Sequence, residues 1–137
     1  MTEFEDRLRT APSERFSGAE HQIDLIGAAK ALRAEPHLSS QGHRQIALLH
    51  HGPVRLILYA FDLGGRLPEH HAPGWTTMHV LRGTITVVSS LQHYTLQAGQ
   101  VLALDPGVPH SVEAVTESDM LLGVYPSSVL AAEVPGA

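Results

Sequence analysis

The stretch Gly64–Gly83, GGRLPEHHAPGWTTMHVLRG, decides the fold of this chain. It holds three histidines, His70, His71 and His79, and its glycines and prolines divide it into short extended segments. A second histidine-bearing turn, LDPGVPHSV, follows at residues 104–112. The function therefore depends on whether these two stretches face each other across one cavity.

Composition narrows the class of protein. The 137 residues predict a single domain. The net charge of -5, with basic residues scattered singly, argues against a nucleic-acid-binding surface. The absence of cysteine excludes disulfides and thiolate metal sites. The charged N-terminus lacks the apolar region of a secretory signal, and no apolar run approaches the roughly 20 residues of a membrane span. We expect a soluble, cytoplasmic protein that is rich in histidine.

The chain changes its pattern once, near residue 43. Residues 1–22 are polar and aperiodic, and we interpret them as an N-terminal tail or arm. A short helix is predicted within residues 23–36, capped by Asp24 and ended by Pro36. From 43 to 130 about nine short β-branched and leucine-rich runs alternate with turns every 8–12 residues or so, which is typical of an antiparallel barrel or sandwich.

One of these runs is apolar on both faces. In VRLILYAFDL, residues 54–63, neither set of alternate residues is polar. A strand with one solvated face would alternate. The outer face must therefore be covered, either by the predicted helix or by a second subunit, and we expect a homodimer because an open sheet of this size has edges to protect.

The first stretch resembles one of the two motifs of the cupin superfamily, G-x5-H-x-H-x3,4-E-x6-G. With a three-residue spacer, Gly64 and Gly83 match the two glycines, and His70 matches the first histidine. Ala72 and Thr76 then occupy the positions of the second histidine and the glutamate. The chain therefore resembles a cupin_2-like conserved barrel in which the first metal motif is degenerate.

The second stretch resembles the other cupin motif, G-x5-P-x-G-x2-H-x3-N. Gly99, Gly107 and His110 match it, whereas Asp105 and Ala114 stand at the proline and asparagine positions. The resemblance spans residues 64–114. It implies an all-β fold, an antiparallel double-stranded β-helix (jelly-roll) barrel with one short N-terminal helix.

Strand geometry limits how many histidines can reach one cavity. Residues i and i+2 of a strand share a face, so the adjacent His70 and His71 point to opposite faces unless a bulge intervenes. An alternative register, with a four-residue spacer, would present Glu69 and His71 together, but it places Leu63 at the leading glycine. We rank this alternative second.

Four histidines remain candidate metal ligands: His70, His110, His71 and His79. His70 and His110 match ligand positions in the preferred register. A third ligand, which catalytic metal sites normally have, would come from His71, His79 or Glu69. If Thr76 faces the cavity, alternation turns His79 outward. Nitrogen and oxygen ligands would admit Zn, Ni, Mn, Fe or Cu, so a divalent metal is possible without its identity being fixed.

The cavity is expected to be largely apolar. The lining residues that we predict are Glu69, Trp75, Thr76, Met78, Tyr94 and Leu104. Three functions compete: a barrel that binds a divalent metal, a small ligand or both; a metal-dependent small-molecule enzyme of the dioxygenase or isomerase type; and metal-free acid–base catalysis by His70 or His110 with Glu69 or Tyr94 as partner. The missing motif glutamate at Thr76 disfavours an oxygenase with two histidines and one carboxylate, so we favour the binding protein and leave its enzymatic status open.

Overall fold

The computed structural model describes residues 16, 18–36, 41–90 and 92–127. The predicted tail, residues 1–22, and the end of the predicted barrel, residues 43–130, therefore lie partly outside the described residues. The described part contains one helix, α2 (Leu25–Arg33), followed by strands. These strands are β1 (His43–His51), β2 (Val54–Phe61), β3 (Arg66–His70), β4 (Trp75–Arg82), β5 (Thr84–Ser89), β6 (His93–Gln97), β7 (Val101–Leu104), β8 (His110–Ala114) and β9 (Ser118–Tyr125).

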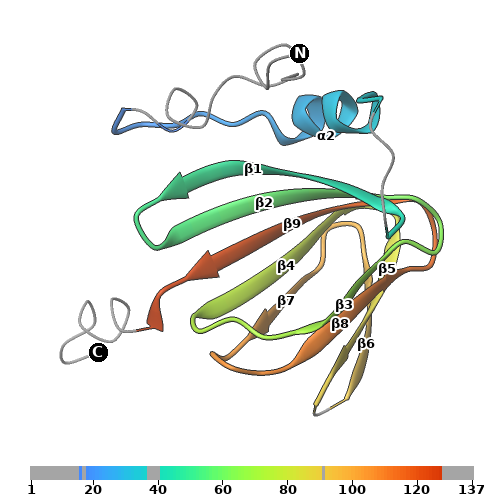
Figure 1. Cartoon of the computed structure of the whole chain (residues 1–137). Coiled ribbons are helices and arrows are strands. Elements are labelled where there is room, and N and C mark those ends of the chain that lie inside the picture. The colour runs from blue at the N-terminus through green and yellow to red at the C-terminus, as the bar shows by residue number, and fades with distance from the viewer. Residues whose placement is uncertain (1–15, 17, 37–40, 91, 128–137) are drawn as a thin grey trace, which may run out of the picture.

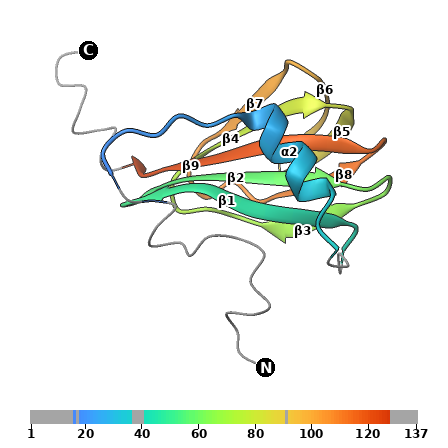
Figure 2. The same ribbon diagram turned by 90° about the horizontal axis from the view of Figure 1, so that it is seen from above.

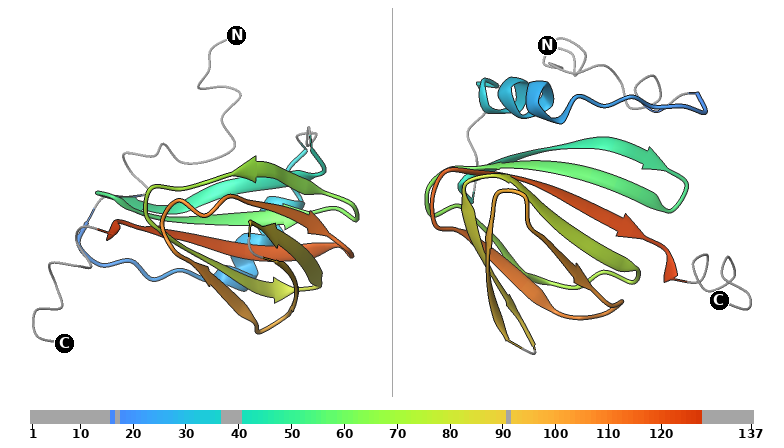
Figure 3. Two further views of the ribbon diagram at one scale, coloured as in Figure 1. Left: turned by 90° about the horizontal axis from the view of Figure 1, so that it is seen from below. Right: turned by 180° about the vertical axis from the view of Figure 1, so that it is seen from behind.

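The strands form two antiparallel sheets that face each other. The five-stranded sheet has the order β1-β2-β9-β4-β7, and the four-stranded sheet has the order β3-β8-β5-β6. Figure 1 shows α2 outside the five-stranded sheet, with the other sheet on its opposite side, and the view from behind in Figure 3 shows the same layers. The prediction of an all-β jelly-roll barrel with one short N-terminal helix is confirmed.

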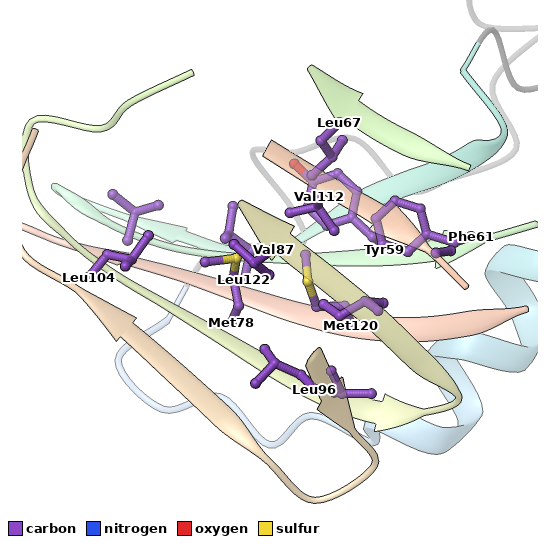
Figure 4. Packing of buried hydrophobic residues seen from close by; sticks show 14 residues of the cluster. Tyr59, Phe61, Leu67, Met78, Val87, Leu96, Leu104, Val112, Met120 and Leu122 are labelled. Carbon is purple, nitrogen blue, oxygen red and sulfur yellow. The ribbon is translucent and has the colours of Figure 1, made fainter. Parts of the chain in front are cut away.

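The core lies between the two sheets, where alternate residues of each strand meet. Met78, Met120 and Leu122 come from the five-stranded sheet, and Val87 and Val112 come from the other (Figure 4). All five side chains are buried in one apolar cluster. This alternation fixes which face of each strand points inward, and it positions the site at the end of β3 and the start of β8.

Helix α2 covers the outer face of β2. The carboxylate of Asp24 caps the helix by accepting a 3.0 Å hydrogen bond from the backbone N–H of Gly27. Ala29 and Leu32 are buried against Leu58 and Ala60, the outward residues of β2. Seen from above, α2 runs across the strands of this sheet (Figure 2). The apolar character of both faces of residues 54–63 thus has an explanation within one chain.

A network of ion pairs joins α2 to the barrel. Arg33, in the last turn of α2, donates to one carboxylate oxygen of Asp119, and Arg82 of β4 donates to the other oxygen at 3.1 Å. Arg82 also donates to Glu117 at 2.9 Å. The side chain of Asp119 is only 9% exposed, and both of its oxygens are paired within the fold. These contacts fix the end of α2 over the start of β9.

The glycine that ends the first motif is required by the turn between β4 and β5. Gly83 has φ +86°, which other residues rarely adopt. A Cβ atom at this position would collide with the backbone of Glu117 and Ser118. Among the described residues, no helix has the length and apolar character needed to cross a membrane.

Candidate functional site

His110, the first residue of β8, is the most deeply buried histidine of the described residues. It is 1% exposed, and its Nδ1–H donates to the carbonyl oxygen of Val108 at 3.0 Å. A carbonyl oxygen can only accept, so this bond places the proton on Nδ1 and leaves a lone pair on Nε2. The Nε2 atom is buried and has no hydrogen-bond partner. Burial lowers the pKa of His110 from its ordinary value, which favours the neutral ring.

His70, the last residue of β3, stands beside it in the same tautomer. Its Nδ1–H donates to the carbonyl oxygen of Pro68 at 3.0 Å. The ring centroids of His70 and His110 are 4.2 Å apart, and the rings meet edge to face at 63°. Each ring therefore uses Nδ1 for a backbone carbonyl two residues earlier and keeps Nε2 available. A positive charge on either His70 or His71 would also lower the pKa of His110.

A β-bulge in β3 brings these two rings together. Leu67 pairs with Val112 and His70 pairs with His110, so Pro68 and Glu69 together stand opposite one residue of β8. In a regular strand with Leu67 facing the core, His70 would face away. The extra residue reverses this alternation. Proline suits the bulge because β3 is an edge strand and Pro68 has no N–H to donate.

The other candidate ligands do not complete a cluster. Glu69 and His71 are both exposed, Glu69 within the bulge and His71 just after β3. His79 alternates with the buried Met78 and Val80 and therefore lies on the outer face of β4, away from the barrel interior. Among the described residues, no group of three or more histidines or carboxylates is arranged to hold a metal ion.

Most of the predicted lining lies on the inner side of the barrel. Thr76, Met78 and Leu104 are buried, and Tyr94 packs against the core cluster. The hydroxyl of Tyr94 accepts a hydrogen bond from the side-chain amide of Gln92 at 2.9 Å. Trp75 differs from the expectation: it precedes the inward Thr76 on β4, so alternation turns it outward, where it is exposed.

Sequence reasoning missed most of the partly buried apolar side chains at the edge of the core cluster and the two carbonyl acceptors. Partly buried side chains that pack against the core come from several strands and loops: Ile57, Ala72, Tyr94, Leu102 and Val108. Only Tyr94 was expected. The carbonyls of Pro68 and Val108 carry no sequence signal as acceptors, although each lies two residues before a histidine and each tripeptide contains a proline.

The arrangement offers two imidazoles whose Nε2 atoms are not used by the fold, that of His110 buried and that of His70 on an exposed side chain. Such a pair can ligate a cation, accept hydrogen bonds from a ligand, or accept a proton. The chemistry of the site therefore depends on the two Nε2 atoms.

Comparison with known proteins identifies the fold family. The profile of the cupin domain matches residues 57–125, about half of the chain. No curated protein has a sequence that matches this chain.

Three of the solved structures that share the fold illustrate the similarity. A conserved protein of unknown function from Streptococcus pyogenes is 21% identical, with coverage of 81% of this chain and 93% of that one and a TM-score of 0.64. A cupin superfamily protein from Desulfitobacterium hafniense is 17% identical, with coverage of 80% and 94% and a TM-score of 0.65. Salicylate 1,2-dioxygenase from Pseudoaminobacter salicylatoxidans, crystallised with gentisate, is 19% identical, with coverage of 74% and 32% and a TM-score of 0.62. By the profile match and this shared fold, the chain belongs to the cupin superfamily.

Proposed function

We propose that the barrel binds a small ligand together with a divalent cation at the pair formed by His70 and His110. The observation that carries the proposal is the buried Nε2 atom of His110, which has no hydrogen-bond partner and lies beside a second imidazole. A buried polar atom without a partner is costly. Within the described residues, His21 Nε2 and His43 Nδ1 are also buried without a partner, but His110 is the most deeply buried of the three and has a second imidazole centroid 4.2 Å away. A cation or ligand atom at Nε2 would remove that cost.

The two histidines have the tautomer that metal-binding histidines usually have. Histidines that bind metals usually donate the other ring N–H to a backbone carbonyl or a carboxylate, which fixes the tautomer. Both His70 and His110 do so. Zn, Ni, Mn, Fe or Cu are compatible with imidazole ligands. When bound, such a cation would polarise an oxygen atom of a ligand.

The missing third protein ligand favours binding over catalysis. Catalytic metal sites normally have three protein ligands, and Ala72 and Thr76 stand where the motif would supply two more. A cation held by two imidazoles keeps positions for oxygen atoms of water or of the ligand. The apolar side chains of Ile57, Leu102 and Val108 at the core would contact the remainder of the ligand.

Acid–base catalysis without a metal is the second candidate. Its support is the lowered pKa of His110, which keeps the ring neutral and able to accept a proton near neutral pH. The proton would be accepted at Nε2, because Nδ1 is occupied by the bond to Val108. His70 could then act as the neighbouring acceptor or hydrogen-bond partner.

We also propose that the protein works as a cytoplasmic homodimer. The support is that α2 covers only part of the outer face of the five-stranded sheet. Its core contacts reach Ile46, Leu58 and Leu81, whereas Val101 on the edge strand β7 is 54% exposed. Sedimentation velocity of the wild type and of Val101→Glu would test this, because a charge in a dimer interface should shift the species to the monomer.

Metal analysis of the purified full chain tests the main proposal. After supplementation with Zn, Ni, Mn and Fe in turn, we expect close to one cation per chain in the wild type and strong loss in both His70→Ala and His110→Ala. His79→Ala is the matched control, since it removes a histidine from the outer face of β4 and should keep the cation.

Two results would contradict the proposal. No cation in the wild type under any supplementation would leave ligand binding or metal-free catalysis. A cation that persists in His70→Ala and disappears in His71→Ala would show that the four-residue-spacer register, with Glu69 and His71, is the correct one.

A further inference from the structure

A groove separates α2 from the adjacent end of the barrel. It has a volume of about 490 Å³, within the roughly 300–1,000 Å³ of pockets that hold small molecules. Leu25, Ile26 and Ala29 line it from α2, and Leu81 lines it from the end of β4. Ile26 is 77% exposed, so a large apolar side chain faces solvent here without a partner. The groove lies outside the barrel, away from the His70–His110 pair.

Among the described charged side chains of the groove, one positively charged side chain has no ion-pair partner. Arg33 and Arg82 both interact with Asp119 and Glu117, so these four side chains neutralise one another. Lys30, one turn after Ile26, also lines the groove. In the part of the chain that the structure describes, Lys30 has no ion pair. The groove therefore combines an apolar wall with one net positive charge, in a protein whose formal net charge is -5.

We infer that this groove binds a monocarboxylate with an apolar chain. The apolar chain would cover Leu25, Ile26 and Leu81, and the carboxylate would pair with Lys30. Burial of the chain supplies the main driving force, because removing apolar surface from water is favourable. The single lysine then selects an anion over a neutral or cationic amphiphile of the same length.

The arrangement of α2 explains why the groove can discriminate by charge. Ile26 and Lys30 are four residues apart and lie side by side on the helix surface. Lys30 can extend its apolar stem along the bound chain and keep its ammonium group near the carboxylate. Arg82 also uses Nε and Nη2 for Asp119 and Glu117. The carboxylates of Asp119 and Glu117 are thus paired with arginines, and this pairing reduces their repulsion of an incoming anion.

Calorimetric titration of the full chain tests the inference, with decanoate as the probe below its micellar concentration. We expect saturable binding at one site per chain and no comparable binding of decanol or decylammonium. Lys30→Met, which keeps the apolar stem, should weaken decanoate binding about three- to tenfold. Lys30→Glu should abolish decanoate binding and create binding of decylammonium. Lys30 is exposed on α2, so these variants should fold normally.

Two controls separate the groove from other sites. Ile26→Glu should abolish decanoate binding, whereas Val101→Glu, which places the same charge at an exposed apolar position of β7, should not. His110→Ala should bind decanoate as the wild type does, whether or not the variant still binds a cation in the barrel. Equal binding of decanoate to the wild type, Lys30→Glu and Ile26→Glu would overturn the inference. Loss of binding only in His110→Ala would also overturn it, because the probe would then occupy the barrel.

Discussion

The molecule contains two clusters of ionisable side chains that differ in how completely their polar atoms are paired. Asp119 is nearly buried, and both of its oxygens accept hydrogen bonds from arginines. His110 is more deeply buried, yet its Nε2 atom has no partner. Complete pairing favours the folded state, because a buried polar atom without a partner costs about 1–3 kcal/mol. The difference teaches that the first cluster stabilises the fold, and it supports our proposal that the second binds a ligand.

Breaking the paired cluster should have the largest effect on stability. Asp119→Ala leaves Arg33 and Arg82 without their common carboxylate, and we expect the free energy of unfolding to fall by about 2–3 kcal/mol. Urea denaturation measures the change. Asp62→Ala is the matched control, because Asp62 is half exposed and lies 3.9 Å from Arg33, so its loss should cost less than about 0.5 kcal/mol. Equal losses in both variants would show that Asp119 is not the centre of the network.

Removing the unpaired atom should have a smaller effect. In His110→Phe the buried Nε2 disappears, which offsets the lost bond to Val108, and we expect the unfolding free energy of chelator-treated protein to stay within about 1 kcal/mol of the wild type. A saturating divalent cation should then stabilise the wild type and leave the variant unchanged. A loss well above 1 kcal/mol in the variant would mean that the imidazole supports the fold.

The same pair should make stability depend on pH in a defined direction. Burial lowers the pKa of His110 in the folded state below its ordinary value of 6.5. Between the two pKa values the unfolded chain binds more protons than the folded chain. The unfolding free energy of metal-free protein therefore has its full value above about pH 6.5 and decreases as the pH falls below 6.5. Urea denaturation at a series of pH values should show this decrease in the wild type, and His110→Phe should show less of it.

Most of the fold was accessible from the sequence, because it depends on patterns that repeat. The expectation of about nine short strands between residues 43 and 130 corresponds to β1–β9 of the described residues, since turns and alternation are encoded locally. The outward position of His79 followed from the same alternation. The helix was predicted from its cap, Asp24, which the structure shows. One of the two expected covers of residues 54–63, the helix itself, is the one that packs on β2.

The arrangement of the candidate site was less accessible, because it depends on pairing between distant strands. The bulge at Pro68 and Glu69 is defined by the register of β3 against β8, so the sequence allowed it without requiring it. The outward position of Trp75 was not predicted, although Thr76 was placed inward. Pro73 and Gly74 precede Trp75, so the sequence did not define the residue at which β4 begins. The Arg33–Asp119 pair joins residues 86 positions apart and carries no local pattern.

The smallest effect is expected at the rim of the paired cluster. Arg82 donates to Glu117 at 2.9 Å, but both side chains are about half exposed. Glu117→Gln should therefore lower the unfolding free energy by about 0.5 kcal/mol or less, and added salt should remove the difference by screening the wild-type pair. The hydrogen bond from Arg82 lowers the pKa of Glu117 below its ordinary value of 4.5. The contribution of this carboxylate is thus present above about pH 4.5 and decreases as the pH falls through the lowered pKa. A large, salt-independent fall in the unfolding free energy of Glu117→Gln would contradict this expectation. It would mean that the exposed Arg82–Glu117 pair, which solvent should screen, contributes most of the stability of the network.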